Sequence, residues 1–146
     1  LVDGFKFLVS QGTVSASIMP FGSSTIPRAV FNVPRFSITN FGYLFRPTTR
    51  ERNRIFEIRK ALSRGNPVIL EMGTTANFTA WTAPYYQITS PPTETHYLVI
   101  VGYDETDKVF ELRSSFGRNW ADAGYVKMSY DDVARYASNG YVIIPR

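Results

Sequence analysis

Residues 95–125 read THYLVIVGYDETDKVFELRSSFGRNWADAGY, and this stretch decides the fold. It contains the only histidine of the chain, His96, just before the apolar run of residues 98–101. A polar turn, residues 114–117, begins eighteen residues after the histidine. A buried strand that begins at a histidine, with a polar turn returning toward it, holds an imidazole rigidly. Because its ordinary pKa is about 6.5, such an imidazole can move protons at neutral pH.

Taken alone, His96 fits two roles. A catalytic base needs a nucleophile beside it and a third group that orients its ring. Ser114 and Ser115 are the nearest candidates for the orienting group, and Phe116 and Trp120 would shield that contact from water. The alternative is a structural histidine at the start of a strand. For an isolated histidine, the structural role is the more common one.

The composition indicates one domain with a sizeable core. The chain has 146 residues, of which 44% are hydrophobic and 15% aromatic, and this length suits a single domain over residues 1–146. No apolar run approaches the roughly 20 residues of a membrane span. The chain contains no cysteine, which excludes disulfides, thiolate metal sites and a cysteine nucleophile within it. With a single histidine, a histidine-cluster metal site is excluded too, and we expect no metal and no cofactor.

The net charge is +4, and much of the excess lies in residues 46–64. A basic run of this kind can contact nucleic acid. No recognised nucleic-acid motif accompanies it, so we interpret the run as the solvated face of a helix and do not expect a nucleic-acid partner. The chain begins at Leu1, inside what reads as a helix already under way, which predicts a processed or truncated polypeptide. The sequence indicates no compartment.

Residues 48–64 form the clearest predicted helix. Thr48 with Glu51 matches a capping box, an apolar stripe runs along one face, and Gly65 ends the helix. We also expect an amphipathic helix over residues 2–9, ended by Gly12, and a short helix over residues 130–137. Residues 21–46 predict a long loop with short extended pieces. The predicted strands cover residues 67–72, 97–103, 108–113, 124–128 and 141–144, which gives an α+β pattern.

Two motifs resemble the C-terminal half of papain-like cysteine peptidases. Residues 96–104 read His-x-Leu-Val-Ile-Val-Gly-Tyr-Asp, and residues 114–125 read x-Ser-x-Gly-x-x-Trp-x-x-x-Gly-Tyr. The family has a His-Ala-x-x-x-Val-Gly-Tyr strand followed by Asn-Ser-Trp-Gly-x-x-Trp-Gly-x-x-Gly-Tyr. Residues 3–21, 58–72 and 76–81 also look like family segments, in order and at compatible spacings, so the resemblance covers nearly the whole chain.

The resemblance implies a fold and a division of the chain. It implies a papain-like α+β fold with an antiparallel β-barrel lobe plus part of the helical lobe. Residues 1–20 would then form the edge of the helical lobe, and residues 21–146 would form mainly the barrel lobe. The family's nucleophilic cysteine, its oxyanion-hole glutamine and its central helix have no counterpart in this chain.

The resemblance also implies a catalytic pair with supporting aromatic residues. His96 matches the catalytic histidine, and Ser114 stands where the family has the asparagine that orients it. Phe116 and Trp120 match the two tryptophans of the family turn. Ser114 and Phe116 are therefore departures from the family pattern. The shorter serine side chain must sit closer to the imidazole or use a water.

Three further residues match positions near the specificity pocket, and we expect them to contact substrate. They are Val68, Thr95 and Tyr97. Tyr97 departs from the small residue usual after the family histidine, and its ring would crowd the pocket.

These features leave two functions open. In the first, the chain is the C-terminal part of a cysteine peptidase, and its histidine activates a cysteine supplied by an N-terminal portion. In the second, it is a non-catalytic pseudopeptidase that binds a peptide or protein, or packs in an assembly. In both, we expect the N-terminal portion of the fold or another chain to cover the helix of residues 1–9 and to bury Phe5 and Leu8.

Overall fold

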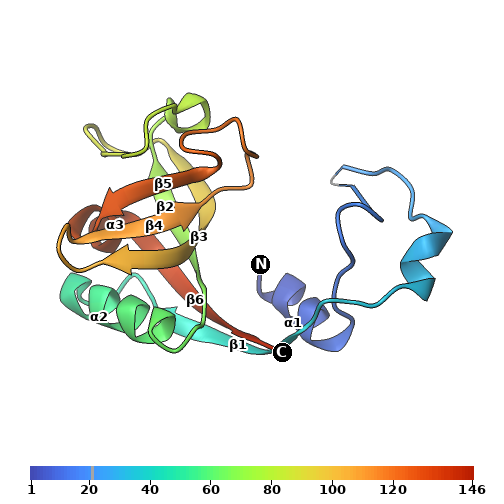
Figure 1. Ribbon diagram of the computed structural model, residues 1–146. Coiled ribbons are helices and arrows are strands. Elements are labelled where there is room, and N and C mark those ends of the chain that lie inside the picture. Colours follow the sequence, from blue (N-terminus) through green and yellow to red (C-terminus); the bar gives the residue numbers. More distant parts are fainter. Residues whose placement is uncertain (21) are drawn as a thin grey trace. The chain divides into compact units, whose positions relative to one another are not determined.

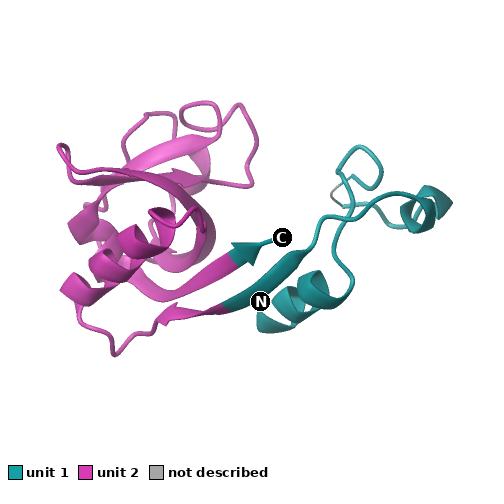
Figure 2. Cartoon of the chain, turned by 60° about the horizontal axis from the view of Figure 1, so that its bottom comes forward, with its two compact units in different colours: residues 1–41, 144–146 teal, residues 42–143 magenta. Residues whose placement is uncertain are grey.

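The computed structural model describes residues 1–20 and 22–146. The chain divides into two compact units (Figure 2). Unit 1 contains residues 1–41 and 144–146, and unit 2 contains residues 42–143. Phe21, the first residue of the predicted long loop, lies outside the described residues. Among those that are described, no helix is long and apolar enough to cross a membrane.

The central element is a six-stranded sheet with the strand order β1-β6-β2-β3-β4-β5 (Figure 1). Strands β2, β3, β4 and β5 pair as an antiparallel series, and β6 pairs antiparallel with the other side of β2. The α+β class predicted from the sequence is confirmed. The strands are β1 (Ile38–Phe45), β2 (Val68–Thr74), β3 (Glu94–Asp104), β4 (Val109–Arg113), β5 (Tyr125–Ser129) and β6 (Ala137–Pro145).

Alternate residues of the central strands are buried because successive side chains of a strand point to opposite faces. In β2, Leu70 and Met72 are fully buried, and β3 places Leu98 and Ile100 on the same side. Leu70 pairs with Leu98, so the buried sets of the two strands coincide. Helix α2 (Glu51–Leu62) contacts β2 and β3, and it also packs on α3 (Tyr130–Tyr136), which closes this core.

The predicted closed barrel is wrong, because the sheet is open. Its edge strands are β1 and β5, and they do not pair with each other. A loop occupies the outer edge of β5 instead. The Lys127 amide donates to the Pro84 carbonyl at 2.8 Å, and the Tyr86 amide donates to the Lys127 carbonyl at 2.9 Å. The amide and the carbonyl of Lys127 at this edge therefore already have partners in the loop and cannot pair with another strand.

Helix α2 begins later than predicted, and the predicted capping box of Thr48 and Glu51 is wrong. The helix begins at Glu51, and Arg50 at the N-cap makes no side-chain cap hydrogen bond. The nearby threonine hydroxyl, of Thr49, accepts from the Arg46 amide at 3.1 Å instead. Gly65, by contrast, has a φ of 77° just after the helix, as expected of a glycine that ends it.

Arg54 of α2 does not belong to a solvated face. Its side chain is 7% exposed. It donates only to backbone carbonyls, at distances of 2.5–2.8 Å, and it lies 5.6 Å from the Phe45 ring. The reading of residues 46–64 as wholly solvated is therefore wrong at this position. The accepting carbonyls belong to Pro47, Thr49, Ala134 and Ala137.

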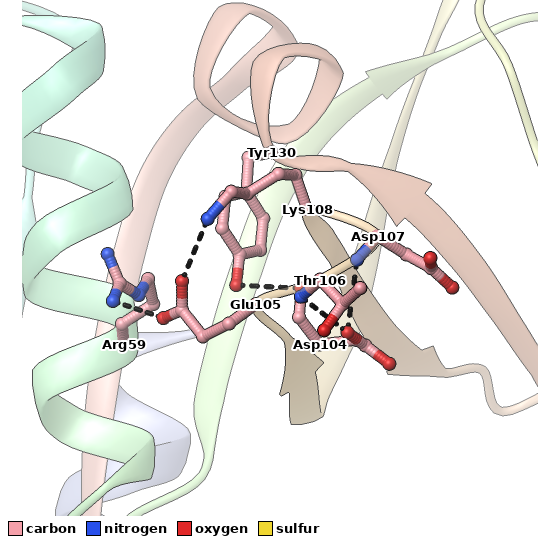
Figure 3. A network of polar contacts seen from close by, with 7 residues as sticks. All are labelled: Arg59, Asp104, Glu105, Thr106, Asp107, Lys108 and Tyr130. Atoms are coloured by element: carbon pink, nitrogen blue, oxygen red, sulfur yellow. Dashed lines mark hydrogen bonds and ion pairs between the residues drawn. The ribbon is translucent and has the colours of Figure 1, made fainter.

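Arg59, one turn later, joins α2 to the turn between β3 and β4 (Figure 3). It pairs with Glu105, which also binds Lys108 at 3.2 Å. This turn, residues 104–107, is held by the Asp104 carboxylate, which accepts from two amides of the same turn at 2.7 and 3.1 Å. These backbone hydrogen bonds lower the pKa of Asp104. The Tyr130 hydroxyl at the start of α3 donates to the Asp104 carbonyl at 3.2 Å.

Unit 1 contains helix α1 (Val2–Ser10) and a short 3-10 helix, η1 (Arg28–Asn32). The prediction that Phe5 lies uncovered is wrong. Phe5 is 2% exposed, and its ring centre lies 5.1 Å from that of Phe41 in the middle of β1. Phe7 is 57% exposed instead. The eight-residue strand β1 also replaces much of the loop predicted for residues 21–46.

Candidate active site

His96 lies near the start of β3, opposite Met72 of β2. It shares the inward face of the strand with Leu98 and Ile100, and its side chain is half-buried at the end of the core. The alternation that buries these two aliphatic residues therefore also fixes the direction of the imidazole. A one-residue slip of β3 would turn the ring to the other face.

Two phenylalanines hold the imidazole ring. Phe116, on the turn after β4, stacks on it with ring centres 4.7 Å apart and an interplanar angle of 19°. Phe78, in the short helix η2 (Phe78–Ala80), lies 5.5 Å from it at 56°. Phe116 was predicted from the sequence as a residue of the site, whereas Phe78 was not. The alternation of exposed Asn77, buried Phe78 and exposed Thr79 is the signal that marks it as an inward anchor.

The Nε2 atom of His96 is buried and has no hydrogen-bond partner. Ser114, which the resemblance places behind the ring, is buried too, with 8% of its surface exposed. Its hydroxyl instead accepts from the Phe116 amide at 3.4 Å. Within the described part of the chain, no hydrogen bond joins Ser114 to His96. The structure thus brings the two residues to one site without the orienting contact.

Burial lowers the pKa of His96, and the charge of Glu94 opposes that shift. The cationic form would have to bury an Nε2–H group without an acceptor, which is costly. The neutral imidazole is therefore the favoured state of the folded chain near neutral pH. A neutral ring can accept a proton on Nδ1 only in the tautomer that carries its hydrogen on Nε2.

Trp120 supports the two phenylalanines from behind. It is 4% exposed, and its indole N–H donates to the Phe78 carbonyl at 2.9 Å. Its ring lies 5.0 Å from that of Phe78 and 5.5 Å from that of Phe116. The turn after it is tight. Gly124 has a φ of 94°, and a Cβ there would meet the Gly117 carbonyl oxygen at 3.1 Å.

The three residues predicted to contact substrate lie in different environments. Val68 is fully buried opposite Ile100, so it has no surface to offer a ligand. Thr95 is exposed, and Tyr97 is 46% exposed on the face of β3 opposite to His96. The cross-strand neighbour of Tyr97 is Glu71, which sequence reasoning missed. The sequence could have indicated it, because Glu71 lies between the buried residues Leu70 and Met72 of β2 and its side chain must therefore point to the other face.

The comparisons with known proteins agree on one family. Residues 34–142 match the model of the Peptidase_C39 like family. The chain is 27% identical over 145 residues to gamete and mating-type specific protein A of Dictyostelium discoideum, covering 94% of this chain and 30% of that protein. It is 26% identical over 145 residues to ananain of Ananas comosus, covering 97% of this chain and 40% of ananain. The chain thus spans less than half the length of these relatives.

Solved structures share the fold. The bromelain protease from Ananas comosus in complex with the E64 inhibitor aligns with a TM-score of 0.69 and 21% identity, over 97% of this chain and 67% of that one. Xylellain, a cysteine protease from Xylella fastidiosa, aligns with a TM-score of 0.69 and 18% identity, over 99% of this chain and 61% of that one. The chain belongs to the Peptidase_C39 like family and is a relative of the papain-like cysteine peptidases.

Proposed function

We propose that this chain supplies the histidine side of a papain-like cysteine peptidase site. His96 is the base, and the nucleophile is a cysteine from a portion of the whole protein outside this sequence, which itself contains no cysteine. The observation that carries the proposal is the imidazole held at the start of β3 by ring stacking. One face of its ring is stacked by Phe116, and Nε2 is buried. Nδ1 is therefore the nitrogen left to exchange a proton with a group outside the chain.

The proposed reaction is hydrolysis of a peptide bond. The Nδ1 atom of His96 takes the proton of the cysteine thiol, and the thiolate attacks the scissile carbonyl. The C–N bond breaks as the imidazolium returns that proton to the departing amine, which leaves a thioester. Water then attacks the thioester, His96 accepts one proton of that water, and the proton returns to the sulfur as the acid product leaves.

The other site residues have proposed supporting roles. Ser114 is proposed as the orienting residue and Phe116 and Trp120 as the shield, which is supported by the stacking of Phe116 on the imidazole and by its contact with Trp120. Thr95 and Tyr97 are the proposed substrate contacts, since they flank His96 in β3 and both are exposed, although their side chains lie on the opposite face of the strand. Val68 has no exposed surface and pairs with Ile100, so it is not proposed as a substrate contact.

A second candidate, a non-catalytic peptide-binding pseudopeptidase, is favoured by the unpaired Nε2 of His96. An imidazolium with this nitrogen buried and unpaired is a poor partner for a thiolate, because the charged form has lost its orienting acceptor. The large Tyr97 side chain, next to the histidine in sequence, also favours this second candidate. A site that has kept its shape while losing this hydrogen bond can still bind an extended chain.

We further propose that the two units are parts of one domain over residues 1–146 and that a partner covers α1. The proposed partner is the N-terminal portion of the fold or another chain. Phe5 is already buried, so the proposed cover is for Leu8, which is half-buried, and for Leu1 and Phe7, which are 50% and 57% exposed. A peptide or protein is the proposed substrate or ligand.

Labelling of the whole protein with E64, the inhibitor in the solved bromelain complex, tests the peptidase proposal. We expect a covalent mass increase on one cysteine, and we expect its rate to fall at least about 100-fold in His96→Ala, as is usual for the loss of a general base. Asp107→Asn is the matched control, because Asp107 is an exposed carboxylate of the turn at the far end of β3 and its loss should leave the labelling rate normal. A folded whole protein that takes up no inhibitor contradicts the proposal and favours the pseudopeptidase.

A further inference from the structure

An open groove lies beside η2 in unit 2, and nothing in the proposed peptidase chemistry uses it. Its volume is about 510 Å³. All the side chains that line it are uncharged, and they combine aromatic rings with amides and hydroxyls. We call it the Asn77 groove, and its main lining residues are Thr75, Asn77, Trp81, Tyr85, Gln87 and Thr89.

The rim of this groove carries the one Asn-X-Ser/Thr triplet of the whole sequence, Asn77-Phe78-Thr79. This triplet is the acceptor signal for N-linked glycosylation, and it requires a surface position in the folded protein. Asn77 and Thr79 are exposed, while Phe78 between them is 1% exposed and anchors the segment in the core. The segment therefore satisfies the structural condition that the triplet imposes.

The acceptor amide is oriented by a short chain of hydrogen bonds. The Thr75 hydroxyl donates to Oδ1 of Asn77 at 2.5 Å, and it lies 2.6 Å from the Tyr86 hydroxyl. Because Oδ1 is held in this way, the Nδ2 atom of Asn77 is the free end of the side chain. Nδ2 is the atom to which an N-linked sugar is joined.

The lining suits a neutral sugar. A hexose has an apolar face of C–H groups, which packs on an aromatic ring, and a rim of hydroxyls, which bonds to amides and hydroxyls. Tyr85 is 50% exposed in the groove and offers such a ring. The Trp81 indole N–H is already used, since it donates to the Tyr85 carbonyl at 3.0 Å. A proline-rich peptide, which needs aromatic N–H and O–H donors for its carbonyls, therefore fits this groove less well.

We propose that Asn77 is an N-glycan acceptor and that the first sugar of the glycan lies in the Asn77 groove against Tyr85. The donor is a lipid-pyrophosphate-linked oligosaccharide. The bond between sugar C1 and the pyrophosphate oxygen breaks, a bond from C1 to Nδ2 forms, and Nδ2 loses one proton as the lipid pyrophosphate leaves. Nδ2 keeps its second hydrogen, and Oδ1 keeps its bond to Thr75.

Mass spectrometry of the whole protein, secreted from a eukaryotic host, tests the acceptor. Peptide N-glycosidase F in ¹⁸O-labelled water should convert Asn77 to a labelled aspartate. Asn77→Gln and Thr79→Ala should each lose the modification, whereas Thr79→Ser should keep it. Asn53→Gln is the matched control, because Asn53 is an exposed asparagine outside any acceptor triplet. An unmodified Asn77 in the secreted protein overturns the proposal.

Thermal unfolding tests the groove. After an endoglycosidase has trimmed the glycan to its first sugar, the protein should melt about 2 °C or more above the Thr79→Ala variant. This difference should vanish when both proteins also carry Tyr85→Ala, and it should persist with Phe31→Ala, an exposed aromatic of unit 1. An equal difference with and without Tyr85, or no difference at all, overturns the placement in the groove. Neither outcome depends on E64 labelling, so this proposal and the peptidase proposal can fail separately.

Discussion

Arg54 and His96 are two basic side chains, and they differ in how their buried nitrogens are hydrogen-bonded. Arg54 is 7% exposed and donates to carbonyls of the loop before α2 and of the end of α3. His96 is half-buried and has a buried ring nitrogen with no partner. Arg54 is thus a buried basic side chain whose hydrogen bonds are made, whereas the buried nitrogen of His96 has none among the described residues. Arg59 Nε and Thr74 Oγ1 are unpaired as well, so an unpaired buried atom alone does not identify a site.

The largest expected effect comes from Arg54. We expect Arg54→Met to lower the free energy of unfolding by about 3 kcal/mol or more, because several buried carbonyls lose their only charged donor. Urea denaturation of the whole protein measures this loss. Arg52→Met, one position earlier but exposed, should change stability by no more than about 0.5 kcal/mol. Equal losses of stability in the two variants would show that the buried hydrogen bonds of Arg54 do not stabilise the fold.

Completing the hydrogen bonding at His96 tests the other side. Ser114→Asn lengthens the side chain behind the ring and offers an amide oxygen to Nε2. We expect the pKa of His96 to rise, since the acceptor stabilises the charged form. The chemical shifts of the imidazole, followed by NMR against pH, report it. Ser115→Asn, on the exposed neighbour, should leave the pKa unchanged. A lowered pKa in Ser114→Asn would show that burial outweighs the new bond.

The turn after the site stores a smaller amount of strain. Ala123 is exposed and has a φ of 52°, in the left-handed region that favours glycine. We expect Ala123→Gly to raise the free energy of unfolding by about 0.5–1 kcal/mol. Ala76→Gly is the control, because Ala76 is exposed at a negative φ and glycine there should lower stability. Denaturation of both variants by urea decides whether the site turn is strained.

The smallest expected effect is a pH dependence of stability from His96. Its pKa is lowered in the folded state, so the unfolded chain binds more protons as the pH falls below about 6.5. The free energy of unfolding should therefore fall through this range and level off below the folded pKa. His96→Gln should lack this component, which the difference between the two stability curves isolates. A wild-type curve that rises on acidification relative to His96→Gln would contradict the lowered pKa.

Sequence reasoning captured the elements with strong local periodicity. The apolar run of residues 98–101 identified β3, and the glycine at position 65 ended α2. It expected only short extended pieces where β1 lies, because Asn40 and Gly42 interrupt the apolar pattern there. It also missed the open sheet, because closure depends on whether a distant loop or a strand takes the edge of β5. Neither choice leaves a local signature.

At the site, the residue types could be read from the sequence but their bonds could not. His96, Phe116 and Trp120 come together as the spacing indicated. The unpaired Nε2 depends on the reach of the Ser114 side chain, and the Ser114 hydroxyl prefers the Phe116 amide two residues away. The burial of Arg54 depends on carbonyls more than 75 residues later in the chain, at Ala134 and Ala137. Local pattern carries no information on either.

The aromatic cluster behind His96 gives the chain an optical reporter. Only two tryptophans are present, and Trp120 contacts both phenylalanines that touch the imidazole. A protonated imidazole near an indole quenches its fluorescence, whereas a neutral one does so weakly. Emission from Trp120, isolated with a Trp81→Phe background, should thus report the charge of His96 and the arrival of a ligand at the ring. The site can be observed in solution without any label.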